Sequence, residues 1–367
     1  HGEGARRDPA AAPPSPRRVT IGAAGDVLVH LKVARSAREH ADEGGFAHVF
    51  GELASVIGDD EIAFANLETP LSDRVPAESG EPPVLGAPAE VARALGGAGI
   101  DVVSVANNHS YDQTAAGLAD TLEALDEADV RAAGADADVA RAPGPVVVER
   151  DGVRVAFVAF TERVNRGPVA RGDYVHVARF DEAAARAILA RARRAADVVV
   201  LSIHWSHDFV EQPLIAQREH ARALVEAGAD LVIGHGPHVL QEVERLASPR
   251  GDAVVAYSLG NLVSNQGLRY FAGRRIPEGL HPAVVLPATR DGAWLRTGFA
   301  LEDGRVRVER LEAVPLWTHN NYLDVARRRA DRLDIRVRPL RAIDETLRTE
   351  RRPAIADALG DEVELRE

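Results

Sequence analysis

Apolar, β-forming runs alternate with amphipathic, helix-patterned segments along most of this chain, and no other feature limits its possible folds as strongly. Strand-like runs lie, in chain order, at residues 18–26, 61–68, 100–109, 197–205 and 230–235. Helix-patterned segments lie between them, near residues 31–41 and 47–57, from Pro88 onwards, and near 114–128, 181–196 and 214–228. Such alternation is typical of a layered α/β fold, with sheets flanked by helices.

Further strands are expected outside this alternating set. A short strand is expected at residues 130–134, and the pattern at 145–160 predicts a hairpin because Asp151-Gly152 stands at its tip. Residues 281–288, 293–303 and 305–316 are expected to form antiparallel strands. We expect a flexible tether at residues 1–18, an α/β domain at 19–317 and a charged, helical C-terminal extension at 318–367.

Composition narrows the classes of function. The 367 residues are 46% hydrophobic and can bury a large core, as one domain with an appendage or as two. A formal net charge of −12 argues against nucleic acid as a partner, because its phosphates would be repelled. There is no cysteine, so a metal would have to bind nitrogen and oxygen ligands. The lone lysine, Lys32, follows no glycine-rich loop, so the phosphate-binding loop of ATP-splitting enzymes is absent.

The chain ends give a weaker indication of location. No apolar run approaches the ~20 residues of a membrane-spanning helix. The chain begins at His1 and contains no methionine, so we expect that the natural N-terminus has been removed, and a signal peptide or lipid anchor could have been lost with it. An extracytoplasmic protein, at the cell surface or anchored to a membrane, is the resulting expectation.

Side chains of the types that bind metals or substrates stand at the ends of the strand-like runs. The first run ends in Asp26, with His30 four residues later; the second ends in Asn66 and Glu68, the third in Asn107, Asn108 and His109, the fourth in His204, and the fifth in His235, with His238 beyond it. Ligands of open α/β sheets bind beyond the carboxyl ends of the strands, so we expect these side chains to meet at one edge. Imidazole, carboxylate and amide donors together suit zinc, manganese or iron. Two ions about 3.5–4 Å apart would need a bridging carboxylate, which Asp26 or Glu68 can supply.

The loop at 234–238, Gly-His-Gly-Pro-His, adds a local reason for this hypothesis. Glycine at 234 and 236 allows a sharp turn at the strand end, and Pro237 stiffens it, so that His235 and His238 can point into one site. The competing interpretation is that the strand-end histidines are inert polar groups of an ordinary α/β domain. A serine hydrolase is disfavoured, because Ala256 replaces the first glycine of the nucleophile motif around Ser258.

Six motifs occur in an order and spacing that resemble the CapA family, the poly-γ-glutamate capsule synthesis proteins. They are GDVLVH, NLETPLS, ANNHSYD, HWSHDF, GHGPHVLQ and YSLGNLVSN, and the resemblance covers residues 19–317. That family is related in fold to the calcineurin-like metallophosphoesterases, whose sites hold two metals at strand ends. The resemblance therefore implies a metallophosphatase-type α/β sandwich for this chain.

The resemblance also implies roles for individual residues. The implied metal ligands are Asp26, Glu68 in the bridging place, Asn108, His204, His235 and His238, and the implied catalytic pair is His109, as proton donor, with Asn108. Residues expected to contact substrate are His30, Asn66, Asn107, His207 and Asn261. Gly236 stands where the family commonly has a histidine, and Ser206 where it has glycine. For this reason the number of ions, one or two, is left open, and His207 and Asp208 are possible substitutes for the missing histidine ligand.

The implied mechanism is hydrolysis by a metal-bound hydroxide, formed because a divalent ion brings the pKa of water from about 15.7 towards about 7. The substrate would be a phosphoester or an anionic polymer such as poly-γ-glutamate, and membrane-bound capsule synthase subunits are expected partners. Arg163, Arg166 and Arg171 are candidate contacts for a polyanion. The alternative is a non-catalytic component that binds or exports the polymer.

Overall fold

The computed structural model of the chain describes residues 16–58, 61–169, 174–273 and 278–367. Within these residues the strands form one 15-stranded sheet, of which the continuous path runs β4-β3-β2-β1-β12-β13-β10-β8-β7-β6-β5. The strands on this path are β1 (Arg17–Val27), β2 (Glu61–Leu67), β3 (Val102–Ser104), β4 (Arg131–Ala133), β5 (Val146–Arg150), β6 (Val153–Thr161), β7 (Val198–His204), β8 (Leu231–His235), β10 (Gly251–Ala256), β12 (Asp291–Glu302) and β13 (Arg305–Asn320). The strands that pair beside the path are β9 (Val243–Ser248), β11 (Asn261–Val263), β14 (Ile335–Pro339) and β15 (Glu364–Leu365).

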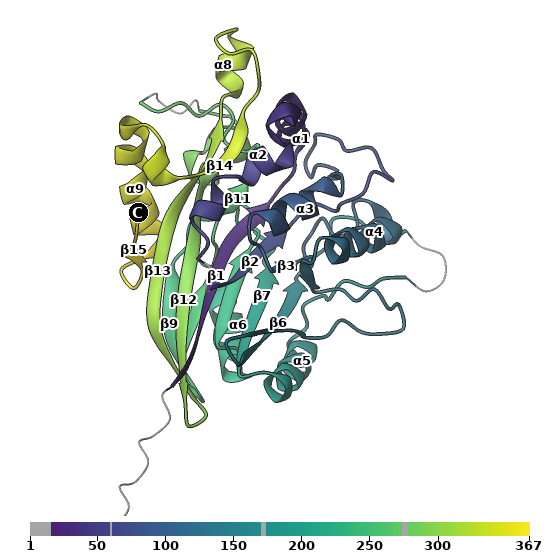
Figure 1. The fold of residues 1–367 in the computed structure, drawn as a ribbon, viewed down its shortest axis with the longest axis vertical. Helices are drawn as coiled ribbons and strands as arrows, with labels where there is room; N and C mark the ends of the chain where they lie inside the picture. Colours follow the sequence, from purple (N-terminus) through teal and green to yellow (C-terminus); the bar gives the residue numbers. More distant parts are fainter. Residues whose placement is uncertain (1–15, 59–60, 170–173, 274–277) are drawn as a thin grey trace, which may run out of the picture.

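Two parallel half-sheets make up most of this path. Strands β1 to β4 are parallel neighbours in one half, and β6, β7, β8 and β10 are parallel neighbours in the other. The antiparallel hairpin β12–β13 joins the halves, because β12 pairs with β1 and β13 pairs with β10. Figure 1 shows β12 and β13 as long, curved strands along one side of the molecule.

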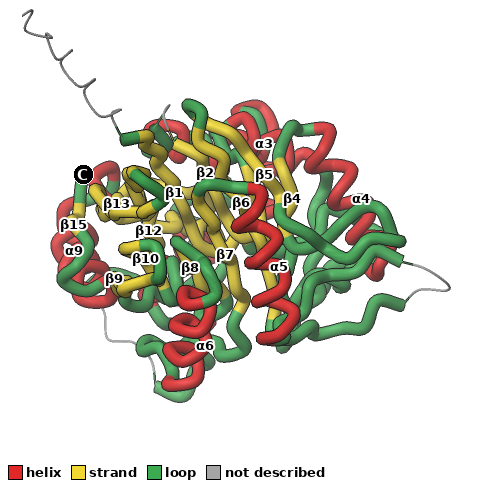
Figure 2. Tube along the Cα trace, turned by 90° about the horizontal axis from the view of Figure 1, so that it is seen from below, coloured by secondary structure: helices red, strands yellow, loops and turns green. Residues whose placement is uncertain are grey.

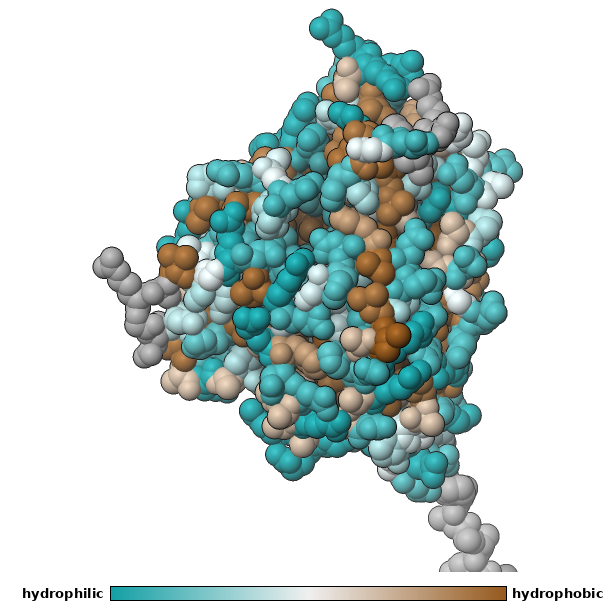
Figure 3. Space-filling view, turned by 180° about the vertical axis from the view of Figure 1, so that it is seen from behind, coloured by the Kyte–Doolittle hydropathy of each residue, from teal (hydrophilic) through white to brown (hydrophobic). Residues whose placement is uncertain are grey.

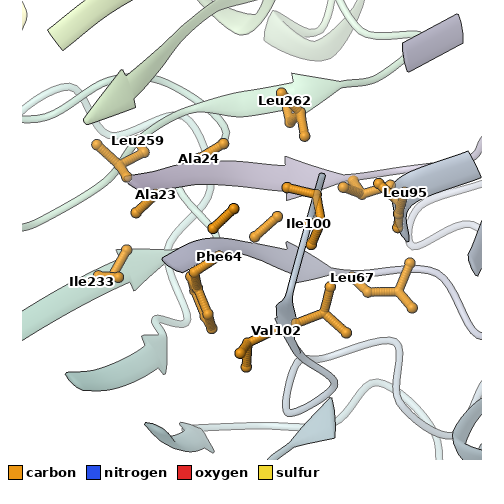
Figure 4. Close-up of a cluster of buried hydrophobic side chains, with 14 of the residues drawn as sticks. Ala23, Ala24, Phe64, Leu67, Leu95, Ile100, Val102, Ile233, Leu259 and Leu262 are labelled. Carbon is orange, nitrogen blue, oxygen red and sulfur yellow. The ribbon is translucent and has the colours of Figure 1, made fainter. Parts of the chain in front are cut away.

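The half-sheets face each other across the main core. Phe64 of β2 and Phe157 of β6 stack with ring centroids 5.7 Å apart, and β1 also contacts β6 and β8. Figure 4 shows Phe64 with Ile233 of β8 and Ala23 of β1 in this buried cluster. Each large apolar side chain buried in this way contributes about 1.5–3 kcal/mol to folding. The expected sandwich is therefore present, although its two halves belong to one hydrogen-bonded sheet.

Helices cover the outer faces of both halves. The helices are α1 (Leu31–Glu39), α2 (Phe46–Phe50), α3 (Glu90–Gly97), α4 (Thr114–Glu127), α5 (Glu182–Ala195), α6 (Ile215–Glu226), α7 (Pro282–Val285), α8 (Tyr322–Ala326) and α9 (Glu345–Leu359), with 3₁₀ turns at Ala41–Glu43, Leu53–Ser55, Pro287–Arg290 and Leu340–Ala342. A second apolar cluster fills the space between α5, α6 and the outer face of β6, β7, β8 and β10. Figure 2 shows α5 and α6 along this side of the strands. The mixed α/β class expected from the alternating pattern is confirmed.

The surface behind the view of Figure 1 is mainly hydrophilic, with smaller hydrophobic areas between the polar ones (Figure 3). Large exposed apolar side chains lie far apart in the sequence, at Leu31, Val139, Val147, Val169, Ile215, Phe271 and Leu280. None of the helices in the described residues has both the length and the apolar character that crossing a membrane requires.

Several local expectations can be compared directly with the structure. The hairpin is confirmed: β5 and β6 pair antiparallel around Asp151 and Gly152, both with positive φ. The strand expected at 281–288 is wrong, because these residues form α7 and a 3₁₀ turn, each opened by a proline, Pro282 and Pro287. A proline at a first helical position is favourable, whereas it removes a hydrogen bond from a strand.

The C-terminal segment contains strands as well as the helices that the sequence predicts. Residues 318–367 contain α8 and α9, as expected, and also β14 and β15, which pair with β13. Most of the tether expected at residues 1–18 lies outside the described residues, as does Arg171.

Candidate metal centre

The two half-sheets bring their carboxyl ends to one buried place. Asp26 lies near the end of β1, Glu68 directly follows β2, and Asn108 lies in the turn after β3. His204 and His235 are the last residues of β7 and β8, and they are register partners in that parallel pair. The exposed fraction of these five residues is 4% or less. The expectation that the strand ends meet is therefore met by the geometry.

Asp26 is the most heavily contacted side chain of the group. Asn66 donates to its Oδ1 at 2.9 Å, and His238 Nδ1 lies 3.0 Å and Gly236 N 3.3 Å from its Oδ2. His235 Nδ1 lies 3.1 Å from Oδ1, without the alignment of a hydrogen bond. Burial alone would raise the pKa of Asp26, but the close His235 and His238 rings lower it well below its usual value. Asp26 is therefore a buried, charged carboxylate.

Glu68 has the opposite environment. Its side chain is fully buried, and neither carboxylate oxygen has a hydrogen-bond partner among the described residues. His204 Nε2 lies 3.6 Å and His238 Nε2 lies 3.8 Å from Oε1, which is too far for a hydrogen bond. Burial, with the charge of Asp26, raises the pKa of Glu68 well above its ordinary value. A buried carboxylate without a donor needs a compensating group that the side chains around it do not supply.

Two further candidate ligands, Asn108 and His235, also present atoms without hydrogen-bond partners among the described residues. Asn108 Oδ1 and both ring nitrogens of His235 are buried and lack a hydrogen bond within the described ranges. Ligand atoms of Asp26, Glu68 and His204 all lie within 4.8 Å of one another. Burial lowers the pKa of His204, which keeps its imidazole neutral, as a metal ligand must be. These donors fit a divalent ion such as zinc, manganese or iron.

The two glycines of the 234–238 loop have different roles. Gly236 has φ +101°, and a Cβ there would lie 2.6 Å from the Trp205 carbonyl oxygen and 3.1 Å from His204 Nε2. A side chain such as the family's histidine would therefore collide with this arrangement. Gly234 is not a turn residue, contrary to expectation: it lies inside β8, where a Cβ would meet the Tyr257 carbonyl oxygen at 2.0 Å. Close packing, rather than a sharp turn, requires glycine at that position.

His109 lies beside the group of candidate ligands and is oriented by a residue that sequence reasoning missed. The Asp112 carboxylate lies 2.6 Å from His109 Nδ1 and also accepts the Leu85 N–H at 2.7 Å. The other ring nitrogen, Nε2, is 3.5 Å from Asn165 Nδ2. A carboxylate on Nδ1 directs Nε2 towards the site. The His-x-x-Asp spacing in the quoted ANNHSYD motif is the signal that could have revealed Asp112.

A cavity of about 680 Å³ opens over this centre. Asn108, His109 and His238 are among its lining residues, and its walls include Lys32, Arg163 and Asn165 among others. This volume lies in the range of about 300–1,000 Å³ that is usual for small-molecule sites. A ligand in the cavity would therefore reach His109 and the edge of the candidate metal centre.

The residues predicted to contact substrate divide into three groups. His30 lines the cavity, where its Nδ1 accepts a hydrogen bond from Asn265 N at 3.2 Å. Asn66, Asn107 and Asn261 donate hydrogen bonds within the centre, to Asp26, to the Leu67 carbonyl and to the Thr289 carbonyl respectively, and their contact with substrate stays a prediction. His207 is exposed, and Asp208 pairs with Arg163, so neither joins the candidate ligands. Arg166 lies 3.8 Å from Asp112.

Comparison with known proteins decides the family. The model of the family described as "Bacterial capsule synthesis protein PGA_cap" matches residues 20–266, more than half of the chain. The chain belongs to this capsule synthesis protein family. The capsule biosynthesis protein CapA of Bacillus anthracis is 30% identical over 257 residues, which are 68% of this chain and 61% of that protein. The PGA biosynthesis protein CapA of Bacillus subtilis is 27% identical over 66% of this chain and 62% of its own length. The matched part thus spans about three fifths of each relative.

A solved structure with a similar overall arrangement is the calcineurin-like phosphoesterase YfkN from Bacillus subtilis. It covers 82% of this chain and 91% of its own, at 12% identity and a TM-score of 0.46.

Proposed function

We propose that this PGA_cap family member is a metal-dependent hydrolase of capsule or poly-γ-glutamate metabolism. The observation that carries the proposal is Glu68, a fully buried carboxylate with no hydrogen-bond donor among the described residues and with Asp26, His204 and His238 around it. Burial without a partner is unfavourable, and a divalent cation would reverse that effect. The residues that would hold the ion are Asp26, Glu68, Asn108, His204, His235 and His238.

The ion, when bound, would supply Lewis-acid activation of water and of the substrate oxygen. The chain's own residues supply the rest. Asn66 and the Gly236 N–H hold the Asp26 carboxylate in place, and the buried His204 presents a neutral imidazole. His109, held by Asp112 through Nδ1, has Nε2 available to donate a proton to the leaving group. The Asp112 carboxylate stabilises the charged imidazolium from which that proton leaves.

We further propose an extracytoplasmic location and a phosphoester or an anionic polymer as substrate, with membrane-bound capsule synthase subunits as partners. Support comes from the names of the two relatives, which are proteins of capsule and PGA biosynthesis. Those names describe biosynthesis rather than hydrolysis. They favour, as second candidate, a component that binds or guides the polymer in the cavity without cleaving it.

Turnover by the metal-loaded chain tests the proposal. The protein would be reloaded with Zn²⁺, Mn²⁺ or Fe²⁺ and assayed with a phosphomonoester, a phosphodiester and a γ-linked glutamate oligomer. Asp112→Asn should lower kcat about 10- to 100-fold, because it removes the group that orients His109. The matched control is Asp120→Asn, since Asp120 pairs with Arg74 and Ser72 away from the cavity.

One outcome would contradict hydrolysis, and another would contradict the role of His109. Wild-type protein that turns over none of the three substrates with any of these metals would remove the hydrolase, and binding of the glutamate oligomer would then support the second candidate. Equal kcat in the wild type and Asp112→Asn would remove His109 as proton donor.

A further inference from the structure

Lys32 is the only lysine of the chain and lies on the wall of the cavity over His109, outside the group of candidate metal ligands. It is the second residue of α1, which begins just after the strand end that carries Asp26. Its side chain is partly exposed, and it also lines a smaller adjoining pocket with His30 and Asn265. A cation therefore stands at the junction of two hollows beside the centre.

The surroundings of Lys32 leave its charge available. Within the part of the chain that the structure describes, its ammonium has no carboxylate in ion-pair contact and lies 5.2 Å from the centroid of the Tyr322 ring. An aromatic ring attracts and orients an ammonium group without cancelling its charge. An anion that entered the cavity would meet a cation that is in ion-pair contact with no carboxylate of the described residues.

Two other basic side chains of the cavity, Arg163 and His281, differ in this respect. Arg163 Nη2 lies 3.2 Å from Asp208 Oδ1, and His281 Nδ1 lies 3.5 Å from Glu81 Oε1. A substrate anion would have to compete with a carboxylate for either group. Lys32 is therefore the cavity cation best placed to select an anionic ligand.

The wall that carries Lys32 is held by a series of hydrogen bonds. Asn265 N donates to His30 Nδ1 at 3.2 Å, and Asn320 Nδ2 donates to Asn265 Oδ1 at 3.4 Å. Asn320 Oδ1 in turn accepts the Tyr322 N–H at 2.9 Å, next to the ring that orients Lys32. This series links the loop after β1, the segment after β11 and the start of α8. The segment that carries the Tyr322 ring is thus held in place before a ligand arrives, which lowers the entropic cost of ordering this wall.

We infer that Lys32 binds an anionic group of the substrate, a carboxylate or a phosphate, while the bond to be cleaved lies at the candidate metal centre. The inference rests on the proposed hydrolase function. It selects substrates that carry a negative charge beyond the scissile bond, such as a second side-chain carboxylate of a γ-linked glutamate oligomer or a second phosphate. A substrate with a single anionic group at the cleaved bond would not use Lys32.

Binding measurements on the whole chain test this role. The probes are γ-linked triglutamate and inorganic pyrophosphate, each titrated calorimetrically into the wild type, Lys32→Met, Lys32→Arg and the control Arg131→Met. Arg131 is an exposed residue of β4, outside the cavity lining. Lys32→Met should weaken one probe about five- to tenfold, the effect of one partly exposed, charge-assisted hydrogen bond. Lys32→Arg should keep most of the affinity, and added salt should reduce the difference.

The probe that is weakened identifies the anion as carboxylate or phosphate. The single lysine offers a second readout, since the bound probe should protect its amine from trinitrobenzenesulfonate. Wild-type protein that binds neither probe, or equal affinities in the wild type and Lys32→Met, would overturn the inference. Turnover with an unchanged KM in Lys32→Met would also overturn it and leave the hydrolase standing. Lys32-dependent binding without any turnover would support the anion site and remove hydrolysis.

Discussion

Glu68 and Glu61 are both buried carboxylates, but they differ in their hydrogen bonding. Glu61, at the start of β2, accepts hydrogen bonds from Trp294 Nε1 at 2.9 Å and from Arg296. Glu68, just past the end of the same strand, has no donor among the described residues. The protein itself stabilises the Glu61 carboxylate through these hydrogen bonds, whereas burial of the Glu68 carboxylate becomes favourable only when a cation binds to it.

Replacement of Glu68 should therefore have opposite effects with and without metal. Burial raises the pKa of Glu68 in the folded state, so the folded protein holds the proton of this carboxyl group more tightly than the unfolded chain does. The stability of the metal-free protein therefore falls as the pH rises above the ordinary pKa of a glutamate side chain. Metal-free Glu68→Gln should be more stable than the wild type at neutral pH, by about 1–3 kcal/mol. Added Zn²⁺ should raise the melting temperature of the wild type and not that of the variant.

Thermal melts in chelator and in Zn²⁺ measure both effects. Glu61→Gln is the matched control and should be less stable in either condition, because it leaves Arg296 without its partner. This account of Glu68 would be contradicted if Glu68→Gln had a lower melting temperature than the wild type in chelator. It would also be contradicted if Zn²⁺ raised the melting temperatures of the variant and the wild type equally.

His30 makes a prediction about pH. Burial, with the charges of His109 and His238, lowers the pKa of His30 to about 3. The unfolded chain takes up this proton near pH 6.5, so His30 contributes stability above that pH and loses it as the pH falls towards 3. His30→Asn should reduce the loss of stability between pH 8 and pH 5 by at most about 2 kcal/mol. Denaturant unfolding at pH 8 and at pH 5 measures this change in the free energy of unfolding, with His207→Asn, at an exposed histidine, as the control. An equal loss of stability between the two pH values in His30→Asn and in the wild type would refute the prediction.

At the scale of elements, the sequence predicts strands best where they are buried on both faces. β7 is buried along its whole length, so it appears in the sequence as a continuous apolar run that ends in His204. β14 has alternating buried and partly buried residues and an arginine-rich sequence, which resembles a solvated helix in composition. The pairing of β14 with β13 decides its structure, and that long-range contact cannot be seen in a local pattern.

The same limit applies to the site. The ligand-type residues could be found because each lies at or just after the end of a strand, where the edge of a parallel sheet gathers them. Asp112 was missed because the contact with His109 depends on the shape of the turn after β3 rather than on a strand end. Asn261 was expected to contact substrate, yet its side chain joins three segments through the His238 carbonyl, Gln266 and the Thr289 carbonyl.

The C-terminal helix α9 is expected to depend on one buried ion pair. Arg351 donates from Nε to Asp291 Oδ1 at 3.2 Å, and both side chains are buried. Arg351→Met would leave Asp291, whose pKa burial already raises, without its partner, and should cost about 3–5 kcal/mol. Denaturant unfolding measures this, with the exposed Arg352→Met on the same helix as control. Equal stability of the two variants would show that α9 is held by other contacts.

At the scale of the whole molecule, the candidate centre exists only where the two half-sheets meet. Asp26 and Glu68 come from one half, and His204, His235 and His238 come from the other. An ion held between them would join the halves and add its binding free energy to the stability of the fold. A second group, His40, Glu43 and His48, also presents three metal-binding atoms close together, although Arg332 lies 3.2 Å from Glu43. Any count of bound metal has to separate these two places.

Metal content after reloading with Zn²⁺, Mn²⁺ or Fe²⁺, compared in the wild type, Glu68→Gln and His48→Asn, tests the central claim most directly. We predict one or two equivalents of metal in the wild type and in His48→Asn, and a loss of at least one equivalent in Glu68→Gln. Wild-type protein without metal above background, or equal content in the wild type and Glu68→Gln, would contradict the existence of a metal centre at the strand ends.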